Sequence, residues 1–154
     1  DLAQQLKEHT IKRRYRAIVA GNLKEDEGTV EGPIGRHPID RKKMAINRTN
    51  GKRAVTHYRV LKRFSRFTYI ECQLETGRTH QIRVHMKHIG HPLYGDFLYN
   101  PDYRFLQRQS LHSWKLLFSH PVSGIPMEFT APVPADMQQF LPDTGKDACL
   151  ACIQ

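Results

Sequence analysis

The residues of this sequence best suited to chemistry lie together in one short stretch, residues 74–96. This stretch contains Arg78, His80, Gln81, Arg83, His85, Lys87, His88, His91 and Asp96. His85 and His88 stand three residues apart, a spacing that could chelate a metal ion. However, the stretch lacks an HExxH pair and a matching Cys/His set. Lysine and arginine between the histidines also create a positive field that repels cations, so we predict no metal site.

Phosphate binding fits the same stretch better. Thr76-Gly77-Arg78-Thr79 leads from a predicted strand into a predicted helix, and the free N–H groups of a helix N-terminus favour an anion. Arg78 could contact an RNA phosphate, or form a surface salt bridge. Arg83 lies beside the apolar side of the helix, where a guanidinium needs a carboxylate partner. Asp96 could supply it, and so could a carboxylate outside this chain.

Hydrophobic periodicity predicts the elements that position these residues. Ile82, Met86 and Ile89 recur at helical spacing and predict a helix from about 79 to 89, which Gly90 and Pro92 end. We expect further helices at 1–10 and 134–141, strands at 14–20, 29–34, 54–61, 67–74, 111–118 and 127–130, and an exposed loop at 36–53. This pattern predicts one α+β domain over 1–154, with a mainly antiparallel mixed β-sheet and a few flanking helices.

The net charge of +9 is concentrated before residue 67. A one-sided basic surface attracts polyanions, although it could also be a solvated face. The residues that we expect to grip RNA phosphates are Arg36, Arg41, Lys42, Lys43 and Arg53. No apolar run is long enough to span a bilayer, so we expect no membrane partner. Three sparse cysteines do not form a disulfide framework, which favours a cytoplasmic setting, and we expect no function for the pair Cys149 and Cys152.

Several motifs resemble one known family, the RluA/RluD-type pseudouridine synthases. They are GRTHQIRVHM, GHPLYGD and QSLHSWKLLFSHPVSGIPMEFTAP, preceded by KRRYRAIVAG, EGPIGRHPIDRKKMAI and GKRAVTHYRVL. The resemblance covers the chain from Leu2 to about Leu141, and the RluD type is the most similar. It implies the family's catalytic fold, RNA as partner, and the conversion of uridine to pseudouridine without a metal or cofactor. Ribosomal RNA of the large subunit is the expected substrate, and tRNA is the alternative.

The resemblance also implies roles for individual residues. Arg83 matches the arginine that orients the catalytic aspartate, and Tyr15 matches the tyrosine that stacks on the target base and can relay a proton. We expect Leu93, Arg78, His80 and Gln81 to contact the substrate. Asp96 and Gly95 are expected to hold a turn.

One part of the family pattern is missing from this chain. The family's nucleophile is the aspartate of an Arg-Leu-Asp motif, and no Arg-Leu-Asp occurs here. We therefore expect the chain to be the C-terminal portion of a synthase catalytic domain, incomplete at its N-terminal side and inactive alone. Two other classes stay open: a non-catalytic RNA-binding module such as a ribosome-assembly factor, and a metal-dependent nuclease that chelation would inactivate.

Overall fold

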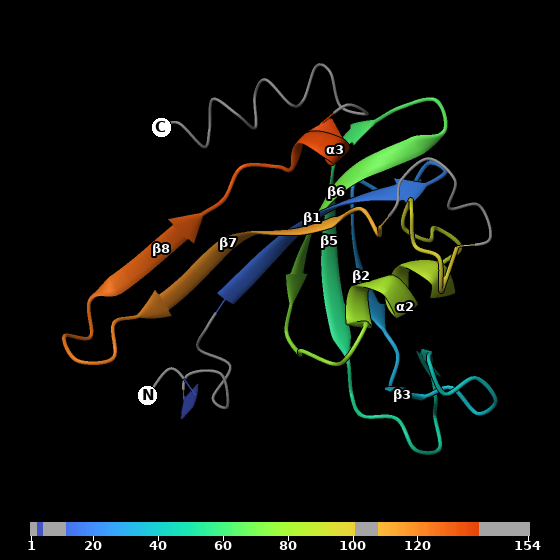
Figure 1. The fold of residues 1–154 in the computed structure, drawn as a ribbon, viewed down its shortest axis with the longest axis horizontal. Coiled ribbons are helices and arrows are strands. Elements are labelled where there is room, and N and C mark those ends of the chain that lie inside the picture. Colours follow the sequence, from blue (N-terminus) through green and yellow to red (C-terminus); the bar gives the residue numbers. More distant parts are fainter. Residues whose placement is uncertain (1–2, 5–11, 101–107, 139–154) are drawn as a thin grey trace.

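A computed structural model describes residues 3–4, 12–100 and 108–138 of the chain, and its centre is a six-stranded sheet (Figure 1). The strands lie in the order β2-β5-β6-β1-β7-β8, and every neighbouring pair is antiparallel. Their bounds are β1 (Lys12–Ala20), β2 (Glu27–Glu31), β5 (Val55–Arg63), β6 (Phe67–Leu74), β7 (Leu111–Ser119) and β8 (Pro126–Thr130). The α+β class is confirmed, and the sheet is not mixed in the part of the chain described.

Alternation along the central strand β1 divides the core into two layers. Ala17 and Val19 are fully buried on one face, where they share a cluster with Ile82 and Met86 of α2 (Gln81–His88). Ile18 points to the other face and packs with Met137 of α3 (Ala135–Gln138). Successive side chains of a strand point to opposite faces, so the two helices cover opposite sides of the sheet.

A second sheet of two strands pairs β3 (Ile34–Arg36), at the start of the predicted loop, with β4 (Met44–Ile46) inside it. The prediction of one long loop over 36–53 was therefore wrong. The surrounding charges hid a short apolar segment that packs with Val84 and Tyr99. The single strand predicted over 29–34 is also wrong, because it breaks at Pro33, which has no N–H to donate to a strand partner.

The other predicted elements agree with the structure to within a few residues. Strands β1, β5, β6, β7 and β8 and helix α2 are confirmed. Helix α2 begins only at Gln81 because His80 adopts a left-handed conformation, and Gly90 follows its end with φ 86°. Of the two predicted terminal helices, residues 1–2, 5–10 and 139–141 lie outside the described residues, as do Cys149 and Cys152. No described helix is long and apolar enough to cross a membrane.

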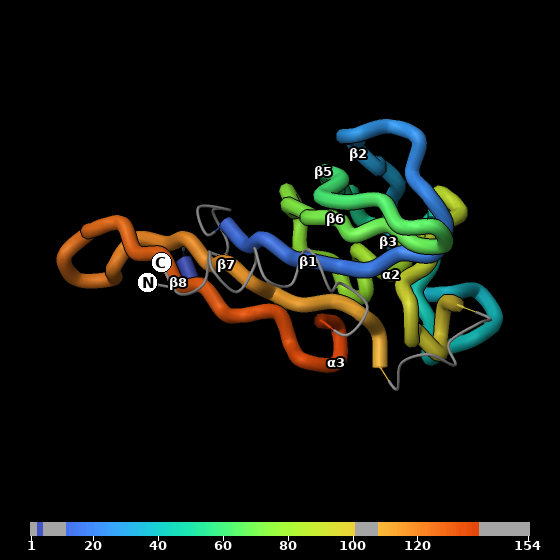
Figure 2. The backbone as a smooth tube through the Cα atoms, turned by 90° about the horizontal axis from the view of Figure 1, so that it is seen from above, coloured from blue at the N-terminus to red at the C-terminus, as the bar shows by residue number. Residues whose placement is uncertain are grey.

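The hairpin of β7 and β8 extends beyond the other strands (Figures 1 and 2). A register shift between Arg14 and Tyr15 accompanies its pairing with β1, and such bulges bend a strand. At the far end of the hairpin Val122 and Ile125 are exposed. The site described below lies at the opposite end of β7, near Leu111.

Cys72 in the middle of β6 is expected to resist thiol reagents in the folded protein. Burial, and to a smaller extent the negative charge of neighbouring Glu71, raises the pKa of Cys72 to about 12, so the reactive thiolate is scarce at neutral pH. With Cys149 and Cys152 replaced by serine, a chromogenic disulfide reagent at pH 8 should titrate no thiol until denaturant is added. Rapid titration of one thiol without denaturant would contradict this burial.

Candidate active site

A pocket of about 230 Å³ lies where β1 and the end of β6 meet the start of α2. It is lined by Tyr15, Leu74, Arg78, His80, Gln81, Ile82, Arg83, Gln109 and Leu111. Both residues predicted as catalytic and three of the four predicted to contact substrate therefore share one cavity. No carboxylate is among these lining residues.

Arg83 is held in place by Asp96 inside the protein. Its Nε and Nη2 donate to the two carboxylate oxygens at 2.8 and 2.7 Å, and the two side chains are 9% and 0% exposed. Asp96 Oδ1 also accepts from the backbone N–H groups of Leu98 and Tyr99, so Asp96 holds its turn as expected. Of the two partners that the sequence left open for Arg83, this chain uses the local one.

His80 stands at the edge of the pocket in a left-handed conformation, with φ 57°. Its Nδ1 is hydrogen-bonded to the Tyr99 hydroxyl at 2.7 Å, and this hydroxyl also accepts from the backbone N–H of Met44. Burial lowers the pKa of His80, and the positive charge of Arg83 lowers it further. The imidazole is therefore held neutral at neutral pH.

Gln81 lines the pocket, but both its amide nitrogen and its amide oxygen are hydrogen-bonded within the protein. It is 3% exposed, and its Nε2 donates to Val55 O and to Thr56 Oγ1. Its Oε1 accepts from the Thr76 hydroxyl and from the backbone N–H of Arg78. Gln81 thus positions the turn that carries Arg78, and one N–H expected to bind an anion is already occupied.

His85 extends this hydrogen-bonded network across the core. It is fully buried, and its Nε2 donates to the carbonyl of Gly32 at 3.0 Å. Its Nδ1 accepts the hydroxyl proton of Thr56 at 2.8 Å, and Thr56 Oγ1 in turn accepts from Gln81. The bonds fix a neutral tautomer and connect the β2–β3 corner to the floor of the pocket.

Lowering the pH from 7.5 to 5.5 is expected to lower the free energy of unfolding, and His85→Gln should reduce that dependence. Burial lowers the pKa of His85 in the folded state, whereas the unfolded chain takes up a proton near its usual pKa of about 6.5. Below that pH the unfolded state binds more protons, so stability falls as pH falls. Urea unfolding at both pH values tests this, with His120→Gln as the control. The same change in the free energy of unfolding between the two pH values in His85→Gln and His120→Gln would contradict it.

Leu93 lies away from the pocket. It is fully buried in the cluster under α2 and pairs as an isolated bridge with Val19. Arg78 is placed at the pocket wall, where its Nε donates to the carbonyl of Arg53 at 2.8 Å. The structure thus places Leu93 in the core and Arg78 at the surface of the cavity.

The predicted phosphate-gripping residues divide into two groups. Arg36, Arg41, Lys42 and Lys43 lie on the β3–β4 hairpin, where all except Lys43 are exposed. Arg53 precedes β5 and forms an exposed ion pair with Glu75 at 3.7 Å. The Arg53 backbone anchors Arg78, so it lies near the pocket rather than with the hairpin.

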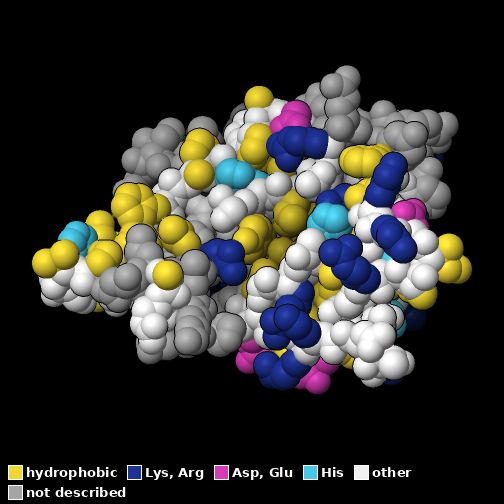
Figure 3. Space-filling model, turned by 60° about the horizontal axis from the view of Figure 1, so that its bottom comes forward, with side chains coloured by type: hydrophobic (Ala, Val, Ile, Leu, Met, Phe, Trp, Pro, Cys, Tyr) yellow, Lys and Arg dark blue, Asp and Glu magenta, His cyan; other side chains and the backbone are white. Residues whose placement is uncertain are grey.

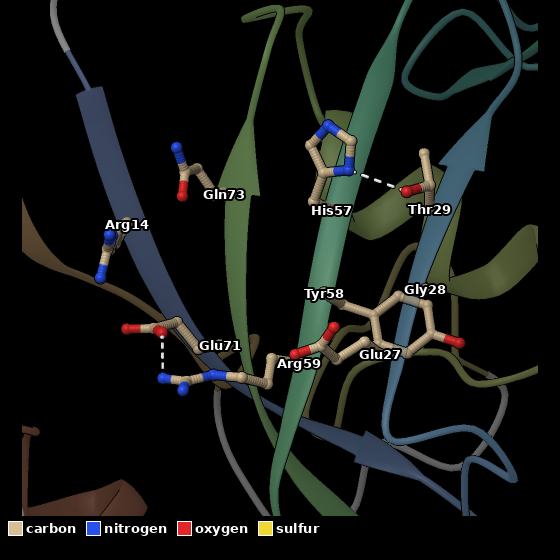
Figure 4. A pocket seen from close by; sticks show the side chains of 9 residues that line it. All are labelled: Arg14, Glu27, Gly28, Thr29, His57, Tyr58, Arg59, Glu71 and Gln73. Atoms are coloured by element: carbon tan, nitrogen blue, oxygen red, sulfur yellow. Dashed lines mark hydrogen bonds and ion pairs between the residues drawn. The ribbon is translucent and has the colours of Figure 1, made fainter.

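A larger cavity of about 450 Å³ opens on another part of the sheet (Figure 4). Glu27 and Glu71 line it beside Arg14 and Arg59, and Arg59 donates to Glu71 at 2.9 Å. Arg14 and Glu71 point away from α2 because they alternate with Tyr15 and Cys72 along their strands. Its two carboxylates would repel an anion, whereas no carboxylate lines the smaller pocket.

Sequence reasoning missed Tyr99, which forms the wall behind Arg83. The guanidinium carbon of Arg83 lies 5.0 Å from the centre of the Tyr99 ring. Leu111 and Gln109 were also missed, because β7 brings them to the pocket from a distant part of the chain. Three or more His, Cys, Asp or Glu side chains do not gather into a possible metal site anywhere in the described part of the chain.

Known proteins with similar sequences are RNA-modifying enzymes by name. The chain is 50% identical over 147 residues to an uncharacterized RNA pseudouridine synthase, YlyB, of Bacillus subtilis, covering 95% of this chain and 48% of that protein. It is 51% identical over 150 residues to ribosomal large subunit pseudouridine synthase D of Nitrosomonas europaea, covering 92% and 43%. The chain thus spans about half the length of the curated relatives it matches.

Solved structures agree with the sequence comparison. Human RNA pseudouridylate synthase domain containing 1 superposes with a TM-score of 0.74 at 28% identity, covering 84% of this chain and 58% of that one. Human RNA pseudouridylate synthase domain containing 4 superposes with the same TM-score of 0.74 at 22% identity, covering 92% of this chain and 65% of that one. At this identity the likeness shows the fold alone. The family model described as RNA pseudouridylate synthase matches residues 1–88, more than half of the chain. This chain therefore belongs to the RNA pseudouridylate synthase family.

Proposed function

We propose that the protein containing this chain isomerises specific uridines of RNA to pseudouridine, with large-subunit ribosomal RNA as the substrate, and that it acts in the cytoplasm. The observation that carries the proposal is the pocket that joins Tyr15 of β1 to Arg83 of α2. An aromatic ring that can stack on a base thus shares a small cavity with a fixed cation. The name of the Nitrosomonas europaea relative supports the ribosomal substrate.

The chemistry divides between this chain and the nucleophile. The target uridine leaves its stack, and an aspartate attacks the nucleoside so that the N1–C1′ bond breaks. After the base rotates, C5 joins C1′ as the aspartate leaves, N1 takes up a proton and C5 loses one. Tyr15 would stack on the uracil and relay the proton lost from C5. Arg83 would orient the nucleophilic carboxylate from the pocket wall. Bidentate bonding to Asp96 keeps its guanidinium from turning away.

The nucleophile itself must come from outside these residues. No aspartate lines the pocket in the described part of the chain, and Asp96 is fully buried and engaged by Arg83. This chain is accordingly proposed as the C-terminal portion of the catalytic domain, inactive alone. A non-catalytic RNA-binding module remains the competing function, and turnover separates the two.

The test is tritium release from large-subunit ribosomal RNA labelled at C5 of uridine, using the full reading frame that contains this chain. The parent protein should release tritium, and Arg83→Ala should not. Arg83→Ala leaves Asp96 as a buried unpaired charge, so a second variant combines Arg83→Met with Asp96→Asn and keeps the site neutral. The control is a double variant of an exposed ion pair, Arg108 with Asp136, changed in the same way to Arg108→Met with Asp136→Asn. RNA binding without release by the parent protein would support the binding module instead.

A further inference from the structure

A further cavity, of about 230 Å³, lies between the β3–β4 sheet and α2. Its floor is apolar, formed by Met44, Ala45, Ile46, Val84 and Tyr99. Its rim is basic, formed by His37, Lys43, Lys87 and His88. We call this cavity the β3–α2 groove. None of the residues predicted as catalytic or substrate-contacting lines it, and Lys43 is the one predicted phosphate contact that does.

The positively charged side chains at the rim of the groove favour an anionic ligand. None of the lining residues is acidic, and no ion pair joins Lys43 or Lys87 to another described residue. Lys87 and His88 are exposed. In Figure 3 the lysine and arginine side chains gather mainly on the half of the face where α2 and the β3–β4 hairpin lie. A phosphate at the rim would meet these cations, and the one carboxylate of the hairpin, Asp40, lines no part of the groove although its charge reaches Tyr99.

The groove and the active-site pocket have no lining residue in common, but Tyr99 connects them. Tyr99 lines the groove, and its hydroxyl bonds to His80, which lines the pocket, and to the backbone N–H of Met44, which lines the groove. Arg83 and Lys87 flank the Tyr99 ring, at 5.0 and 6.0 Å from its centre. They stand one helical turn apart on α2, where Arg83 lines the pocket and Lys87 lines the groove.

We infer that the β3–α2 groove binds the nucleotide next to the target uridine in the RNA strand. This inference rests on the proposed function. A uridine turned into the pocket leaves its neighbour at the mouth, on the far side of Tyr99. The apolar floor suits the face of an unstacked base, and Lys43 and Lys87 suit its phosphate.

His37 adds a hydrogen-bond donor, its ring Nε2–H, to this site. Its Nδ1 accepts from the backbone N–H groups of Ile39 and Asp40 at 3.1 and 3.0 Å. The proton of the neutral ring therefore sits on Nε2. That N–H can donate to a phosphate oxygen or a base carbonyl.

Two matched pairs of variants test the groove in the full-length protein. Lys43→Gln with Lys87→Gln removes the rim charge, and Lys12→Gln with Lys24→Gln removes the same charge from exposed positions that line neither cavity. Ala45→Phe fills the groove, and Ala135→Phe adds the same bulk on exposed α3. The measurements are filter binding of large-subunit ribosomal RNA at several salt concentrations and single-turnover tritium release at saturating RNA.

The rim variant should raise Kd about tenfold at moderate salt. The slope of the logarithm of the binding constant against the logarithm of salt concentration should become less steep by about 0.7 for each lost phosphate contact. Ala45→Phe should also weaken binding, with an unchanged salt slope. Both controls should bind like the parent protein. Equal losses of RNA affinity in the rim variant and its lysine control would contradict the inference that the groove binds a nucleotide. Parental affinity in Ala45→Phe would contradict it as well.

The two proposals fail differently. If the parent protein releases tritium but the groove variants match their controls, the groove inference fails and the proposed function stands. If the parent protein releases none, yet the groove variants alone lose affinity, the groove still binds a nucleotide and the proposed isomerisation fails.

Discussion

Replacing Asp96 with Asn is expected to lower the free energy of unfolding by about 3–5 kcal/mol, because it leaves the Arg83 guanidinium buried without a counter-charge. The side chains of this pair are 9% and 0% exposed. Asn keeps an oxygen that can accept from the N–H groups of Leu98 and Tyr99, so the substitution mainly removes the charge. Equilibrium unfolding in urea, followed by the fluorescence of the single tryptophan Trp114, measures the loss.

The same substitution at an exposed pair is the control. Arg108 and Asp136 form an ion pair at 2.9 Å with side chains 41% and 42% exposed. Water screens such a pair, so Asp136→Asn should cost at most about 1 kcal/mol. Adding Arg83→Met to Asp96→Asn should restore most of the lost stability, since no buried charge then remains. Similar losses for Asp96→Asn and Asp136→Asn would show that burial of the Arg83 pair is not what matters.

Replacing Tyr15 with Phe is expected to slow tritium release by the full-length protein at least about 100-fold while leaving RNA affinity nearly unchanged. The ring that would stack on the uracil remains, but the hydroxyl that would relay the C5 proton is lost, and general acid–base catalysis contributes about 10²–10⁴-fold. Single-turnover release at saturating RNA measures the chemical step. Tyr15 is partly buried, so the fold should tolerate the change.

Tyr58 offers a matched control in the same sheet. Tyr15 and Tyr58 flank Cys72 from the two neighbouring strands, and both pack against the cluster under α2. Tyr58 lines the larger cavity rather than the active-site pocket. Tyr58→Phe should therefore release tritium at the parent rate. A Tyr15→Phe protein as fast as Tyr58→Phe would remove Tyr15 from the proton relay and leave it only a stacking role.

Most of the secondary structure could be predicted from the sequence, because alternation and helical spacing are local signals. Ile82 and Met86 recur with the helical period and are buried in the core under α2, and Ile89, just after the helix, packs against the same cluster. The β3–β4 sheet escaped prediction since each strand has only three residues. What stabilises Ile34 and Ile46 is their packing with Val84 and Tyr99, residues far along the chain.

The sequence by itself determined which residues could form the active site, because Tyr15 and Arg83 each lie in a motif that resembles the family. Only the tertiary structure decided which of them meet. Gln81 was expected at the substrate, yet the carbonyl of Val55 and the hydroxyls of Thr56 and Thr76 take up its amide. Arg83 needed a carboxylate for physical reasons that are plain in the sequence. That it is Asp96 depends on the turn after His91, which brings the two within hydrogen-bonding distance in a buried place.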